Sequence, residues 1–155
     1  MKCKSGVMPE QFDVRLDGKN ALVILCENIE PVTTTSEDGT YTEYIYDRYT
    51  LVVPNRASLF NDVSDNFNDW LTKARQTEYD KLSADVRAKR NELLEESDKE
   101  FLIDRILPSS ISTTAFTAKL KELAQSEMAK YRQALRDIPQ QEGFPYNVTF
   151  PNKPQ

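Results

Sequence analysis

The first third of the chain alternates apolar and polar residues with the period of β-strands. Turn residues separate the alternating or continuously apolar segments, which are rich in β-branched and aromatic side chains. The strand-like segments are residues 12–16, 21–26 and 41–53, and the turns are residues 17–20 and 33–39. This pattern predicts strands joined by hairpins, so we expect a small antiparallel β-sheet of three or four strands over residues 1–56.

The hydrophobic period changes to three and four residues after Pro54, which indicates a helix. No glycine or proline occurs between Pro54 and Pro108, and an apolar stripe begins within this segment. The stripe consists of Phe60, Val63, Phe67, Leu71 and Ala74, and it thins further on to Leu82, Val86, Leu93 and Leu94. We therefore expect one helix over residues 57–96, about 60 Å long if it is continuous. A small sheet covers only its first half.

The distal half of this helix needs another partner, and the sequence leaves two open. A later helix, carrying Phe116, Leu120, Leu123, Met128 and Tyr131 after a turn at residues 108–110, could fold back as a helical hairpin. A second copy of the chain could instead pack there, which would make a homo-oligomer. The long helix, the turn and the second helix together make up a predicted helical region over residues 57–138.

Prolines dominate the end of the chain. Pro139 stops the second helix, and Pro145, Pro151 and Pro154 follow it, so residues 139–155 are expected to form an extended tail. The predicted class is therefore α+β: an N-terminal antiparallel sheet, a long helix, a second helix and an extended tail rich in proline and aromatic residues.

Charge and composition narrow the functional classes. The formal net charge is −5, which argues against binding to nucleic acid or to an anionic membrane surface. No apolar run approaches the roughly 20 residues that cross a bilayer. The N-terminus also lacks the apolar stretch of a signal peptide, so we expect a protein that stays in the cytoplasm.

Catalytic chemistry is not expected. The chain contains no histidine, so it lacks the commonest general base and metal ligand. Its two cysteines, Cys3 and Cys26, are too few and too far apart in sequence for a thiolate metal site, and we expect them to be reduced structural thiols. We predict no cofactor, no metal, no catalytic residue and a function in protein interaction.

Two arginines and a set of aromatic residues are the candidate contacts for a partner. Arg132 and Arg136 lie four residues apart and could clamp a carboxylate of a partner. The alternatives are that both arginines are simply solvated, or that they form an ion pair with the chain's own Glu92, Glu95 or Glu96. The tail aromatics stand among prolines and could dock on a partner or fold back on the chain's own helices. The predicted partner-binding residues are Tyr131, Arg132, Arg136, Phe144, Tyr146 and Phe150.

The same C-terminal segment resembles the phage tail assembly chaperone family. The resemblance rests on a Tyr-Arg-Gln-Ala-Leu-Arg-Asp-Ile-Pro block at residues 131–139, a Gly-Phe-Pro at 143–145 and a closing aromatic-proline pair at 150–151. Residues 87–98 are similar to the helix that precedes the block in that family. Lys99 and Phe150 stand where the family commonly has tryptophan, and residues 101–125 are an insertion between the two halves of the motif.

This resemblance implies a non-enzymatic phage or prophage protein that assists tail or tail-fibre assembly by binding a tail component. Its expected location is the cytoplasm of the bacterial host. The alternative is a structural component of the virion or of a phage-like particle, such as a tail or fibre adaptor. The N-terminal sheet has no counterpart in the motif.

Overall fold

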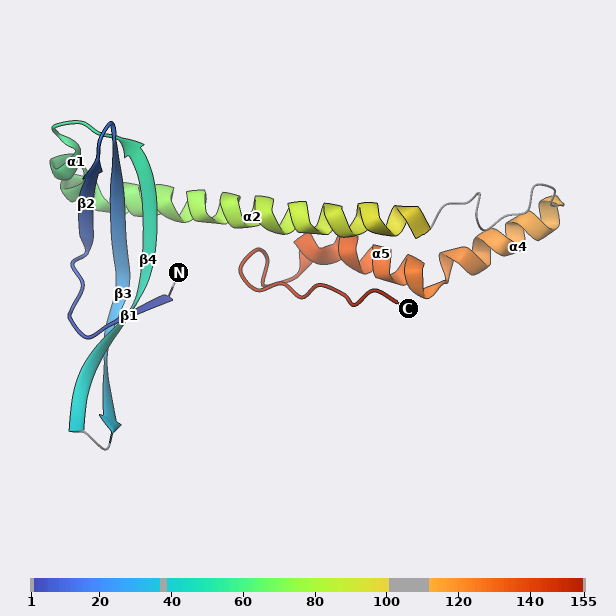
Figure 1. Cartoon of the computed structure of the whole chain (residues 1–155), viewed down its shortest axis with the longest axis horizontal. Coiled ribbons are helices and arrows are strands. Elements are labelled where there is room, and N and C mark those ends of the chain that lie inside the picture. The colour runs from blue at the N-terminus through green and yellow to red at the C-terminus, as the bar shows by residue number, and fades with distance from the viewer. Residues whose placement is uncertain (1, 37–38, 101–111, 155) are drawn as a thin grey trace. The chain divides into compact units, whose positions relative to one another are not determined.

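A computed structural model of the chain describes residues 2–36, 39–100 and 112–154 (Figure 1). The elements in chain order are β1 (Lys2–Ser5), β2 (Phe12–Asp17), β3 (Asn20–Ser36), β4 (Gly39–Pro54), α1 (Leu59–Asp65), α2 (Phe67–Glu100), α4 (Thr113–Ala124), α5 (Glu127–Asp137) and the short 3₁₀ helix η1 (Ile138–Gln140). The predicted α+β class, with the sheet first and the helices after it, is confirmed. The predicted turn at residues 108–110 lies outside the described residues.

The chain divides into two compact units, Met1–Glu78 and Tyr79–Gln155, which are described separately below. Helix α2 contributes its first residues to the first unit and its remainder to the second. The finer division into residues 1–56, 57–138 and 139–155 stays a prediction.

The sheet is fully antiparallel, with its strands in the order β1-β4-β3-β2. A tight turn at Gly18, whose φ of 58° suits glycine, joins β2 to β3. Strands β3 and β4 pair along their whole length, from Asn20 opposite Pro54 to Ser36 opposite Gly39. A bulge on β3 between Glu27 and Glu30 interrupts this pairing and includes Asn28 at φ 51°.

The core of the first unit lies between the sheet and the helices. Alternate residues of β3 (Ala21, Val23 and Leu25) are fully buried on one face, as expected for a strand with one side against the core. They form one cluster with Leu51, Leu59, Val63, Leu71 and Ala74. Burial of each large aliphatic side chain contributes about 1.5–3 kcal/mol, so this cluster is the main source of stability in the unit.

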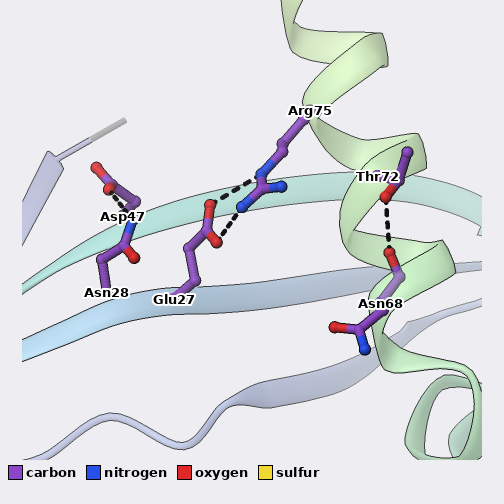
Figure 2. Close-up of polar contacts among 6 residues, drawn as sticks. All are labelled: Glu27, Asn28, Asp47, Asn68, Thr72 and Arg75. Carbon is purple, nitrogen blue, oxygen red and sulfur yellow. Dashed lines mark hydrogen bonds and ion pairs between the residues drawn. The ribbon is translucent and has the colours of Figure 1, made fainter.

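An ion pair adds to this packing (Figure 2). Glu27 on β3 accepts two hydrogen bonds from the guanidinium of Arg75 on α2, one of them from Nε at 2.9 Å. The Glu27 side chain is only 14% exposed, and its hydrogen bond raises the pKa of Arg75 further above its usual range. The next residue, Asn28, donates to Asp47 at 2.9 Å across the strand pair (Figure 2). Polar contacts thus fix both α2 and the bulge.

The helical segment after Pro54 differs from the prediction in one respect. It is two helices, because Asn66 ends α1: its side-chain amide donates to Asp62 O at 3.2 Å and to Asp62 Oδ1 at 3.0 Å. Within α1 the buried residues are Leu59 and Val63, which lie four residues apart on one face, whereas Phe60 of the predicted stripe is not buried. Phe60 is 58% exposed and packs against Phe12, with ring centroids 5.0 Å apart.

The predicted second helix is also divided in two. Helix α4 ends at Ala124 and α5 begins after Ser126, whose hydroxyl accepts a hydrogen bond from the Ala129 N–H at 3.2 Å. Serine is a favoured N-cap because it satisfies a backbone donor that has no intrahelical partner. The prediction of one continuous helix from Phe116 to Tyr131 was therefore wrong, because two helices, α4 and α5, cover this segment.

Candidate functional site

The candidate site belongs to the second unit, where α5, η1 and residues 141–154 pack against residues 79–100 of α2. We call this arrangement the C-terminal clasp. Its core residues Tyr131, Leu135 and Ile138 are at most 5% exposed and recur at the spacing of one helix face. The partly buried residues packed against them are Val86, Leu93, Leu94, Met128, Phe144, Val148 and Phe150. The distal half of α2 therefore has an intramolecular partner in α5 and the tail.

The tail is less extended than predicted, because local hydrogen bonds fold it into turns. The Gln141 side chain donates to Thr149 O and accepts from Thr149 N–H, both at 2.8 Å. Between these residues, the Asn147 N–H donates to Gly143 O at 2.7 Å. A Cβ on Gly143 would lie 2.1 Å from Asn147 O, so this close turn requires glycine.

Two of the three tail aromatics fold back onto the chain's own helix. The Phe144 ring meets Tyr79 edge-on, with centroids 6.5 Å apart, and the Arg87 guanidinium lies 5.4 Å from its centroid. Phe150 lies under the Lys89 ammonium at 4.7 Å. Tyr146 differs because its side chain is 60% exposed, although its ring lies 6.4 Å from Tyr79. Of the three, Tyr146 presents the most surface to a partner.

The two arginines also have different environments. Arg132 is 13% exposed; it donates to Ser97 Oγ and Leu94 O and forms an ion pair with Asp98. Asp98 is therefore an intrachain partner of Arg132, and it was not among the residues Glu92, Glu95 and Glu96 weighed from the sequence. Arg136 is exposed, and among the described residues no ion pair to it is found. Its guanidinium is available to a carboxylate.

A groove of about 490 Å³ opens between the end of α4 and α5. Its lining is Ala124, Ala129, Lys130, Arg132, Gln133 and Arg136. The Lys130 side chain is 64% exposed, and its ammonium pairs with the exposed Glu127 of its own helix at 2.6 Å. The groove thus has three cationic side chains and no acidic lining residue, and we call it the basic groove.

The sequence located Arg132 and Arg136 but not the rest of the basic groove. The groove exists because the chain bends at Gln125 and Ser126, and the sequence interpretation treated these residues as part of one helix. The sequence does contain a signal for this bend. Ser126 is a favoured N-cap residue, and a new apolar stripe begins three residues later at Ala129. Of the other predicted contacts, Tyr131 is buried in the clasp core, where it packs rather than faces a partner.

Residues 2–36, 39–100 and 112–154 contain neither a candidate metal site nor a candidate membrane span. In these ranges there is no group of three or more cysteine, aspartate or glutamate side chains placed to hold a metal ion. No helix in the same ranges has the length and apolar character needed to cross a membrane.

The fold and site define an α+β protein whose C-terminal unit presents a basic groove on a helical clasp. Residues 83–155 match the family model of the phage tail assembly chaperone protein. The match confirms the resemblance seen in the sequence and supports a role in phage tail assembly. It covers nearly all of the clasp, whereas the sheet lies before it. No curated protein and no solved structure matches the chain.

Proposed function

We propose that this chain is a non-enzymatic assembly chaperone that binds a phage tail or tail-fibre component in the cytoplasm of the bacterial host. The observation that carries the proposal is the family match over residues 83–155, because these residues build the clasp and its basic groove. The chaperone would cover surface on the tail component that is prone to aggregate until that component assembles.

The basic groove is the proposed binding site, and its partner is an acidic segment of the tail component. Arg136 is exposed and can bind a carboxylate through two parallel hydrogen bonds, and Lys130 adds a second positive charge. Arg132 lines the same groove in an orientation fixed by Ser97 and Asp98. Tyr146 is proposed as a further contact, while Tyr131, Phe144 and Phe150 support the site by holding the clasp closed.

The test is capture by a tagged copy of the chain from a lysate that is producing phage, with mass spectrometry of the captured proteins and of purified particles. We expect an identified tail or fibre subunit in the captured fraction, and no copy of this chain in the particles. Stoichiometric presence in particles would instead make the chain a virion component, which is the alternative function.

The role of the groove is tested by charge reversal. Arg136→Glu should weaken capture of the tail subunit at least about tenfold, the loss expected when one close charge pair becomes repulsive. Lys81→Glu is the matched control, because Lys81 is an exposed cation on α2 that does not line the groove. Equal capture by the two variants would exclude the basic groove as the binding site.

A further inference from the structure

Strands β3 and β4 extend beyond both of their neighbours. Strand β1 pairs only with Tyr44–Asp47 of β4, and β2 pairs with β3 no further than Leu25. Residues 30–36 and 39–43 therefore form a two-stranded ribbon whose outer edges pair with no strand in the part of the chain that the structure describes (Figure 1). We call the outer side of residues 40–43 the β4 edge. Such edges present backbone donors and acceptors that can pair with another chain.

The strand register identifies which groups the β4 edge presents. Cys26 donates its N–H to Gln11 O at 2.7 Å, away from β4, so its cross-strand partner Arg48 directs its backbone groups away from β3. Directions alternate along an antiparallel strand, so Thr42 and Thr40 also direct their N–H and C=O groups outward. These two residues offer the pattern of donors and acceptors that an added strand needs.

The two edges of the ribbon are not equally protected. On β3, a bulge at Asn28 and the proline at position 31, which has no N–H, hinder strand addition. The β4 edge has neither a bulge nor a proline among residues 40–43, and Thr40, Tyr41 and Thr42 all favour extended structure. An added strand is therefore expected on β4 rather than on β3.

Charge indicates the kind of strand that would bind. No lysine or arginine occurs between Lys19 and Arg48, whereas six acidic residues do: Glu27, Glu30, Glu37, Asp38, Glu43 and Asp47. Among the described members of this set, Glu27 pairs with Arg75 of α2, and the Glu43 carboxylate lies 3.8 Å from the ammonium of Lys4 on β1. A second copy of the same ribbon would bring like charges together, while a segment with lysine or arginine would be attracted.

We propose that the β4 edge binds an extended, lysine- or arginine-bearing segment of another protein by β-strand addition. Backbone hydrogen bonds to Thr40 and Thr42 supply the affinity, and the acidic ribbon selects a basic segment. The identity of the partner as a tail component rests on the proposed function, but the chemistry of the edge does not. An edge this short buries less area than a stable interface, which suits a contact that must be released.

The test removes one outward N–H from each side of the ribbon. Thr42→Pro deletes a donor on the β4 edge without removing a hydrogen bond to β3. Thr33→Pro is the matched control, because Thr33 is the cross-strand partner of Thr42 and lies on the other edge. The probe is a short peptide that alternates valine and lysine, titrated into the full-length protein while backbone amide NMR shifts are followed.

We expect the peptide to shift the amides of Thr40 and Thr42, and Thr42→Pro to weaken its binding at least about tenfold while Thr33→Pro leaves it unchanged. A valine-glutamate peptide should bind at least about tenfold more weakly than the lysine peptide. Equal binding to both proline variants, or no shift at residues 40–43, would overturn the proposal. Dimerisation that Thr42→Pro abolishes would also overturn it, in favour of a second copy.

This test is independent of the basic groove. The variant Arg136→Glu should bind the valine-lysine peptide as the wild type does, even if it no longer captures a tail subunit. Retained circular dichroism of Thr42→Pro and Thr33→Pro shows that both variants fold. Failure of peptide binding with intact capture would reject the β4 edge alone, and failure of capture with intact peptide binding would reject the proposed function alone.

Discussion

Leu135 is fully buried in one cluster with Tyr131 and Ile138, so a smaller side chain at this position leaves a cavity in the clasp. We expect Leu135→Ala to lower the free energy of unfolding by about 2–5 kcal/mol, the range for a large aliphatic residue cut to alanine in a packed core. Urea titration followed by circular dichroism measures the change. The exposed neighbour Gln133 gives the control, because Gln133→Ala should change stability by no more than about 0.5 kcal/mol.

Cys26 makes stability depend on pH in the alkaline range. Burial raises the pKa of its thiol above the ordinary value of 9.0. The folded pKa exceeds the unfolded one, so the contribution to stability is complete below pH 9.0 and is lost as pH rises through the folded pKa. We expect the free energy of unfolding to fall from about pH 9 upward, and to fall less steeply in Cys26→Ala. Urea titrations in reductant across this range measure both slopes.

The wild type must be compared with Cys26→Ala because the pKa of Tyr49 is raised as well. Burial raises the pKa of its phenol too, so the wild-type slope alone does not isolate the thiol. An unchanged slope in Cys26→Ala would show that the thiol contributes nothing. Strand β4 lies between β1, which carries Cys3, and β3, which carries Cys26, and no disulfide joins these two residues in the structure. That both are reduced structural thiols stays a prediction.

Gly143 is a site where a single methyl group changes the tail. An alanine Cβ would overlap Asn147 O, a backbone atom that cannot rotate away, so the turn must open. We expect Gly143→Ala to lower stability by about 1–3 kcal/mol, as overpacking does, and to increase hydrogen exchange at the Thr149 amide. Gly6→Ala is the control, because a Cβ there meets nothing within 4 Å. Equal effects of the two substitutions would contradict the close approach.

At the scale of elements, hydrophobic period was sufficient to predict where sheet and helices lie, but not where the helices break. The breaks depend on side chains that compete for backbone hydrogen bonds: Asn66 with Asp62, and Ser126 with Ala129. Both are polar residues that the apolar pattern does not weigh. This matters for the candidate site, because the bend at Ser126 produces the basic groove. The groove could not be predicted from the position of Arg136 in the sequence.

The ion pair between Glu27 and Arg75 is expected to stabilise the attachment of α2 to β3. Because Glu27 is largely shielded from solvent, Glu27→Gln should cost about 1 kcal/mol in the free energy of unfolding, more than an exposed pair would. Asp13→Asn is the control, because Asp13 and Arg15 form a pair whose side chains are 45% and 68% exposed. If the control costs as much as Glu27→Gln, shielding does not strengthen the pair.

At the scale of the whole molecule, the two hydrophobic clusters share no residue: one contains Leu25, the other Leu135. Substitutions without shared partners have additive effects on stability. We therefore expect the combined loss in Leu25→Ala with Leu135→Ala to equal the sum of the single losses within about 0.5 kcal/mol, measured by urea titration. A larger discrepancy would show that the two cores are energetically coupled.

Helix α2 has one more consequence, which concerns the reach of the family match rather than stability. The family match starts at residue 83, within an unbroken helix and a few residues past the boundary between the two compact units. Residues 1–82, which include the whole sheet, therefore lie outside the matched segment, while nearly all of the clasp lies inside it. The family resemblance thus bears on the clasp and not on the sheet.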